Sequence, residues 1–249
     1  MKYILTILIF LSIYEIKSQH ILNLRERAKV IDKIQDERIN QLLPKLMDET
    51  SIDMWVLITR EYNEDPVIKT LLPPTWLNAR RRTILVFYRN LKRNEFEKAA
   101  ITRYNFGKNI PSIWNKEEEP NQWKALNDFI ISKNPRNIAL NYSDHFALAD
   151  GIVKTDYETF MSSLPKLYHN KVVSAEKLVI RWIETRTKFE MDIFNQLVEI
   201  THAIIKEAFS TKVINYNLPK LLKMKYFFNL IDYGQKLFKM KHFRPKVID

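Results

Sequence analysis

Four short apolar runs, each rich in β-branched and aromatic residues, alternate along this chain with longer segments of helical periodicity. The runs cover residues 53–59, 83–88, 98–104 and 137–142. Polar segments bound each run, a pattern typical of short strands that are buried on both faces. Strands interleaved with helices predict an α/β fold in which helices flank a mixed β-sheet. Because only a short turn near residues 90–94 separates the second and third runs, they are expected to pair antiparallel.

Helical periodicity predicts the elements that surround these strands. The helical segments are residues 24–48, 122–131, 155–163 and 174–210. Pro44 lies inside the first segment, which predicts a kink or a break there. Ser143 and Asp144 are interpreted as the capping signal of a short helix that ends near Ile152. The last segment, at the C-terminal side, is expected to form one broken helix or two consecutive helices.

Glycine and cysteine are scarce enough to exclude several classes of chemistry. The chain has only 3 glycines, Gly107, Gly151 and Gly234, and no cysteine. Isolated glycines so far apart form neither a Walker-type loop nor a dinucleotide fingerprint, so no nucleotide partner is expected. Without cysteine there are no disulfides, no thiolate nucleophiles and no cysteine-ligated zinc.

The first residues predict export. Lys2 precedes an apolar run over residues 3–14, and a polar stretch follows it. The run is shorter than the ~20 residues that a spanning helix needs, so residues 1–18 are interpreted as a secretory signal peptide, with no transmembrane span after its cleavage. Ser18 is a small residue at the cleavage point, although Ile16 at position −3 is unfavourable. An uncleaved short anchor or a buried N-terminal helix remains an alternative.

The net charge of +11 is concentrated near the C-terminus. Residues 215–249 hold seven lysines and one arginine against two aspartates, a net of +6. The signal segment adds +1, which leaves +4 for the rest of the chain, an ordinary solvated surface. Nucleic-acid binding by the body of the protein is therefore not favoured. Residues 213–249 form an atypical basic tail, in which glutamate is missing.

Two segments resemble a known family. In residues 38–57, a helix ending near Met47 leads through Ser51, Ile52 and Asp53 into the first apolar run. This resembles the opening of creatinase-type N-terminal domains, where glycine usually stands in place of Ser51. Residues 186–193, which begin Arg186-Thr187-Lys188, resemble the element that opens the first helix of the same family's catalytic domain.

The family is that of Xaa-Pro aminopeptidase-like, creatinase-type metallopeptidases. Residues 60–66 and 174–176 are also similar to its secreted subgroup, and the resemblance covers roughly residues 24–212. It implies a signal peptide over residues 1–18, a creatinase-like N-terminal α/β domain over 19–173, a helical lead-in over 174–212 and the basic tail over 213–249.

Members of this family do their chemistry in a C-terminal pita-bread domain, where two Asp, one His and two Glu hold two divalent metal ions. Those ligands lie beyond the helix that ends here near Ser210, and the residues after it contain one histidine, His242, two aspartates and no glutamate. The resemblance therefore implies an exported relative that lacks the metal-binding catalytic domain and is inactive alone, with no cofactor in this chain. A break of the reading frame near Ile214 would account for the tail and predicts that it is poorly ordered.

Individual candidate sites have simpler structural interpretations. The histidines at 20, 145, 169, 202 and 242 are scattered singly, and only Asp144, His145 and Asp150 form a local cluster. A metal site there is not favoured, because Asp144 is explained as a helix cap. The acidic run at residues 117–119 is interpreted as a solvated loop. No catalytic, cofactor-binding or metal-binding residue is assigned.

Cationic and aromatic residues leave a binding function open. Arg80, Arg81 and Arg82 could hold an anionic group, and the resemblance makes substrate or partner contact by Arg60 or this triplet conceivable, but a surface role is favoured. The five tryptophans are interpreted as core and interface aromatics, and His202 as an ordinary helix-face residue. The alternative function is a secreted interaction or dimerisation module, with a homodimer or peptide partner, whose basic tail binds an anionic partner.

Overall fold

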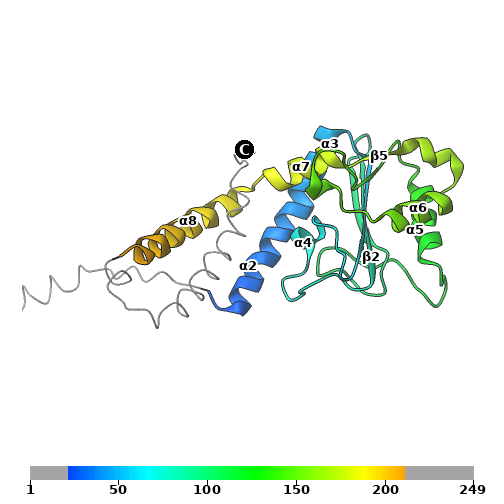
Figure 1. The fold of residues 1–249 in the computed structure, drawn as a ribbon. Coiled ribbons are helices and arrows are strands. Elements are labelled where there is room, and N and C mark those ends of the chain that lie inside the picture. The colour runs from blue at the N-terminus through cyan, green and yellow to red at the C-terminus, as the bar shows by residue number, and fades with distance from the viewer. Residues whose placement is uncertain (1–21, 211–249) are drawn as a thin grey trace, which may run out of the picture.

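One mixed sheet organises the part of the chain that the structure, a computed structural model, describes, namely residues 22–210. Its strands are β1 (Met54–Arg60), β2 (Arg82–Asn90), β3 (Glu95–Ala100), β4 (Ile138–Leu140) and β5 (Val172–Ser174), in the order β3-β2-β1-β4-β5. The β1–β2 and β2–β3 pairs are antiparallel, and the β1–β4 and β4–β5 pairs are parallel. The predicted α/β fold with a mixed sheet flanked by helices is confirmed (Figure 1).

Helices cover both faces of this sheet (Figure 1). One face packs against α3 (Leu43–Thr50), α4 (Ile68–Leu71) and α7 (Glu176–Glu184), and the other against α5 (Gln122–Lys133) and α6 (Lys154–Ser163). Successive side chains of β1 alternate between these two cores, so that Trp55 enters the first and Val56 the second. Both residues are fully buried, which explains why β1 reads as an unbroken apolar run.

The first helical segment is divided by a π turn. Helix α2 (Leu24–Glu37) leads into the π turn Arg38–Leu42, and α3 follows it. The amide of Leu43 donates to the carbonyl of Arg38, five residues earlier. Pro44 has no N–H, and in an α-helix its ring would meet the carbonyl of Asn40. The interruption expected at Pro44 therefore occurs in the turn just before it, where the wider ring of hydrogen bonds makes room.

Two sequence-based boundaries were wrong, and one strand was missed. The third strand is β3, not residues 98–104, because the turn after β2 sets the register at Asn90 opposite Glu95. The short helix expected before Ile152 is only the 3₁₀ turn Ala147–Ala149, since the amides of Gly151 and Ile152 return to the carbonyl of Asn141. The missed strand, β5, follows a second 3₁₀ segment, Lys166–Lys171, and is three residues long, too short to show a period.

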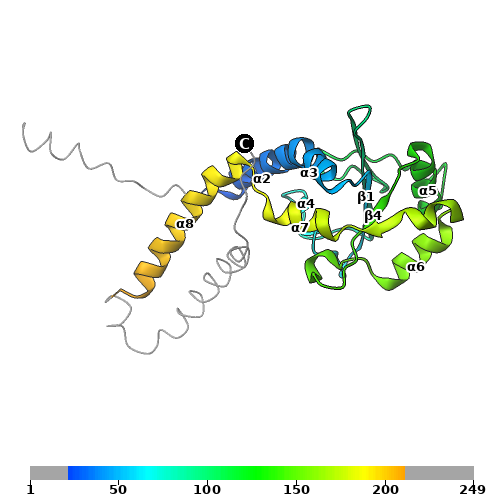
Figure 2. The ribbon, with the colours of Figure 1, turned by 90° about the horizontal axis from the view of Figure 1, so that it is seen from above.

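The C-terminal helical segment consists of two consecutive helices, α7 and α8 (Lys188–Ala208), as one of the two alternatives predicted. Helix α7 buries Leu178, Val179 and Trp182 in the core, and the expected boundary between residues 173 and 174 falls inside β5. Helix α8 extends away from the sheet in both views (Figure 1, Figure 2). Within residues 22–210, no helix has the length and apolarity to cross a bilayer. The predicted signal peptide and basic tail lie outside this range.

Candidate functional site

A buried arginine joins the sheet domain to the start of α8. Arg38 is 6% exposed and lies in the π turn between α2 and α3. Its guanidinium donates to the carbonyls of Thr185 (2.8 Å) and Trp182 and to the carboxylate of Glu190 (2.9 Å). The same group lies 4.2 Å from the ring centroid of Trp182, a cation–π contact. One side chain thus binds the last turn of α7 and the first turn of α8 together.

A capping box within the chain also stabilises the first turn of α8. Thr187 accepts a hydrogen bond from the amide of Glu190, and Glu190 accepts one from the amide of Thr187, which is a capping box. The hydroxyl of Thr187 donates to Glu37 at 2.9 Å, so α2 contacts this cap as well. Burial, reinforced by the neighbouring charge of Arg38, lowers the pKa of Arg186. We call Glu37, Arg38, Arg186, Thr187 and Glu190 the junction cluster.

The junction cluster positions elements and has no reactive arrangement of its own. A shallow hollow of about 120 Å³ lies beside it, lined by Glu37, Gln41, Leu42, Lys45, Arg186, Thr187 and Lys188. Both carboxylates in the cluster are engaged, Glu190 by Arg38 and Glu37 by Thr187. Because the donors and acceptors satisfy one another, the cluster fixes the direction in which α8 leaves the sheet domain.

The most perturbed carboxyl group lies at the carboxyl end of the parallel strands. Asp65 is fully buried and accepts hydrogen bonds from the amide of Val67 (2.8 Å) and the side chain of Asn141 (2.9 Å). Asn141 in turn accepts from the indole of Trp55 at 2.7 Å. Burial raises the pKa of Asp65 to about 6, against the lowering effect of its two hydrogen bonds. Such a shift at a sheet's carboxyl edge is a feature of many active sites.

Asp65 is nevertheless sealed from solvent. A Cβ atom added to Gly151 would lie 2.1 Å from Oδ2 of Asp65, so the backbone of residue 151 closes directly over the carboxylate. No substrate can approach a group that is 0% exposed without a rearrangement of this loop. The network of Trp55, Asn141 and Asp65 therefore fixes the loop after β1, and it supplies no accessible acid or base.

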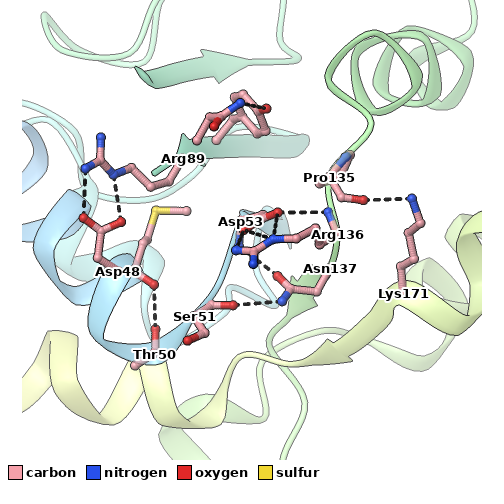
Figure 3. A network of polar contacts seen from close by, with 12 residues as sticks. Asp48, Thr50, Ser51, Asp53, Arg89, Pro135, Arg136, Asn137 and Lys171 are labelled. Carbon is pink, nitrogen blue, oxygen red and sulfur yellow. Dashed lines mark hydrogen bonds and ion pairs between the residues drawn. The ribbon is translucent and has the colours of Figure 1, made fainter. Parts of the chain in front are cut away.

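A second polar network lies at the other end of the parallel strands, where β1 and β4 begin (Figure 3). Asp48 forms a two-pronged ion pair with Arg89, and Asp53 forms one with Arg136, whose shortest distances are 2.8 Å and 2.5 Å. Burial would raise the pKa of Asp53, but its hydrogen bonds and ion pair with Arg136 outweigh burial and hold that pKa below its usual value. Ser51 ends α3 with φ 57° and ψ 35°, in the left-handed region, and its carbonyl accepts from Asn137.

Three of the four arginines singled out in the sequence engage other groups of the protein through their side chains, and Arg81 does so through its backbone. Arg60 forms a two-pronged pair with Asp156 at 2.7 Å, and Arg82 lies 3.1 Å from the same carboxylate, which is buried. Arg80 stacks on Trp76, 4.5 Å from the ring centroid. The backbone of Arg81 bonds to that of Glu61. Arg60 and Arg82 therefore neutralise a buried aspartate, and the triplet forms no common anion site.

The remaining predicted positions have structural roles. Trp55 and Trp182 are fully buried, and the indole of Trp114 donates to the carbonyl of Glu119. His145 and His202 are exposed, and the ring of His169 contacts the carbonyl of Leu164 at 2.8 Å. The capping residue is Ser143 and not Asp144, because the hydroxyl of Ser143 accepts hydrogen bonds from the amides of residues 145 and 146. Among residues 22–210, no three or more His, Cys, Asp and Glu side chains are grouped so that they could hold a metal ion.

Sequence reasoning missed Arg38, Asp65 and Asn141 as the central residues of these clusters. Arg38 had a usable signal, since it is a charged residue that directly precedes the apolar part of a predicted helix. Asp65 and Asn141 gave no such signal, because these two residues contact each other across 76 positions of the sequence.

No protein-family model, curated protein or solved structure significantly matches this chain. The resemblance to creatinase-type domains therefore depends on the residues quoted for it.

Proposed function

We propose that residues 22–210 are the non-catalytic N-terminal domain and the lead-in helix of an exported, Xaa-Pro aminopeptidase-like metallopeptidase, and that this chain hydrolyses no peptide by itself. The observation that carries the proposal is the junction cluster. Arg38 opens one of the two segments that resemble the family, and Glu190 belongs to the other. These residues, 152 positions apart, form a buried ion pair at 2.9 Å. The two motifs thus act as one structural unit.

The residues present do not fit the metal pair of the family. Intact members use two Asp, one His and two Glu, and no such group exists within residues 22–210. In the acidic run at residues 117–119, Glu119 pairs with Lys124 and Glu118 accepts a hydrogen bond from Asn115. We therefore assign no catalytic step to this part of the chain. Its proposed task is to hold α8 in a fixed direction relative to the sheet domain.

The first test is a peptidase assay. The purified chain is incubated with Xaa-Pro peptides, with and without Mn²⁺ or Zn²⁺, and release of the N-terminal residue is measured. We expect no release above that of the same preparation after the tagged chain has been removed. Release that follows the amount of chain, and that disappears with it, would contradict the proposal.

The second test addresses the family directly. The gene is sequenced from codon 205 onward and translated in all three frames. A frame that continues α8 into a domain with two Asp, one His and two Glu would support the proposal, and the joined protein should then cleave Xaa-Pro peptides with a divalent metal. If every frame closes promptly, the peptidase assignment is wrong and the short form is the product.

A further inference from the structure

Helix α8 carries a large apolar surface that the sheet domain does not cover. It has 21 residues, and none of their side chains is buried. Leu197 is 41% exposed and Ile205 44% exposed. Figures 1 and 2 show the helix leaving the sheet domain at its first turn, so the helices that cover the sheet lie far from most of its length. The ammonium of Lys33, on α2, lies 4.0 Å from the ring centroid of Phe189, at the very start of α8.

The apolar residues of α8 form two adjacent rows along the helix. One row is Met191, Phe194, Val198 and Ile205, and the other is Ile193, Leu197, Ile200 and Ile204. Residues three, four and seven positions apart lie on one face of a helix. The first row therefore runs from Met191 to Ile205, with Thr201 and His202 before its last member, and the second runs from Ile193 to Ile204. A monomeric protein rarely leaves a contiguous apolar stripe of this width in water. Some other surface must therefore cover it.

We propose that residues 211–249 of this same chain pack along α8 and cover these two rows. This segment follows α8 directly in the sequence and contains 39 residues. At 1.5 Å per residue, α8 is about 32 Å long, a length that some 21 residues span as a returning helix and fewer as an extended chain. The segment is therefore long enough to turn and return along the whole of α8. It also supplies apolar side chains, including Leu221, Leu222, Phe227, Phe228, Leu230 and Phe238.

Charge distinguishes this occupant from a second copy of α8. Residues 211–249 contain eight lysines and one arginine against two aspartates, a net of +7. Helix α8 contains two lysines against four acidic residues, a net of −2. Two α8 helices packed together would therefore place like charges side by side, whereas the following segment brings the opposite charge. The inference uses only α8 and the residues after it, so it does not depend on the proposed family. It is opposed to the poorly ordered tail that a break of the reading frame near Ile214 predicts, and the test below separates the two.

The test uses the absence of cysteine from the chain, which makes a single introduced thiol a specific probe. Leu197→Cys is placed in the full chain, and the rate of its modification by a maleimide is measured. The same probe is then placed in a full-length variant in which Phe227, Phe228 and Leu230 are each changed to serine. We expect the tail variant to react roughly tenfold faster, because the cover of α8 has been weakened. Ile205→Cys should behave in the same way.

A matched probe separates this effect from a general loss of structure. Leu77 is 98% exposed and lies in the sheet domain, so Leu77→Cys should react at one rate in both backgrounds. Equal rates at Leu197→Cys in the two backgrounds would overturn the proposal. A rate at Leu197→Cys that falls as the protein concentration rises would also overturn it, and would assign the cover to a second copy. Neither result bears on the peptidase assay, so failure of this inference and failure of the proposed function are distinguishable.

Discussion

At the scale of single residues, Ser51 holds a backbone conformation that favours glycine. The residue ends α3, and the amide of Ile52 returns to the carbonyl of Met47 at 2.9 Å, as in a Schellman motif. This geometry requires the left-handed backbone conformation, with φ 57°. Glycine adopts that conformation without strain, whereas a residue with a Cβ atom does not. Ser51 therefore occupies a position where the backbone favours glycine.

We expect Ser51→Gly to raise the free energy of unfolding by about 0.5–1 kcal/mol, because relief of backbone strain exceeds the added entropy of the unfolded chain. Urea denaturation measures the change. Ser162→Gly, inside α6, is the control and should lower stability by about 0.5 kcal/mol, since glycine is a poor helix former there. A loss of stability in both variants would show that Ser51 is not strained.

At the scale of secondary-structure elements, the π turn and the junction cluster act together. Pro44 favours a π turn over residues 38–42, and that turn carries the guanidinium of Arg38 to the ends of α7 and α8. The capping box at Thr187 then starts α8 at the point that Arg38 holds. The direction of a long helix thus depends on one buried side chain in an element more than a hundred residues earlier in the sequence.

We expect Arg38→Met to lower the free energy of unfolding by about 3 kcal/mol, because it removes the buried cationic partner of Glu190 and the guanidinium hydrogen bonds to the carbonyls of Trp182 and Thr185. Hydrogen exchange in the first turn of α8 should become faster at the same time. Arg181→Met is the control. Arg181 pairs with Glu49 at 2.7 Å near the surface, and its loss should cost less than about 1 kcal/mol. If both variants lose the same small amount, Arg38 does not anchor α8.

At the scale of the whole molecule, two aspartates make opposite contributions to stability as pH changes. The pKa of Asp65 is raised to about 6, so the folded state holds its proton more tightly than the unfolded state does. Its contribution is fully present below the ordinary value of 3.8 and is lost as pH rises through 6. The pKa of Asp53 is lowered, so its contribution is present above the ordinary value and is lost as pH falls.

Between pH 4.5 and 7, Asp65 should therefore dominate the change of the free energy of unfolding with pH. We expect it to remove about 2 kcal/mol of the free energy of unfolding over this range. The measurement is urea denaturation at both pH values for the natural chain and for Asp65→Asn, in which this part of the pH dependence should vanish. Asp128→Asn, on the exposed side of α5, should keep it. An unchanged slope in Asp65→Asn would mean that Asp65 does not titrate in this range.

Much of the architecture could be predicted because its signals are local. The runs that became β1, β2 and β4 are continuous in the sequence, and the two C-terminal helices show a helical period over many residues. Strand β5 escaped prediction because three residues carry no period, and its position depends on pairing with β4. The antiparallel pairing of β3 with β2 was predicted correctly, but the bounds of β3 were wrong, because the strand begins directly after the turn at Asn94, where φ is 51°.

For the clusters, the sequence determined which residue types were present, and the tertiary structure decided which of them meet. The absence of cysteine, the isolated glycines and the apolar runs excluded nucleotide loops and predicted the fold class. They did not show that Arg60 and Arg82 share Asp156, or that Gly151 closes over Asp65. Periodicity reports only neighbours along one element, whereas ion pairs and burial depend on distances between elements that the sheet brings together. Local sequence patterns therefore determined the fold class, whereas tertiary packing alone decided which charged groups are partners.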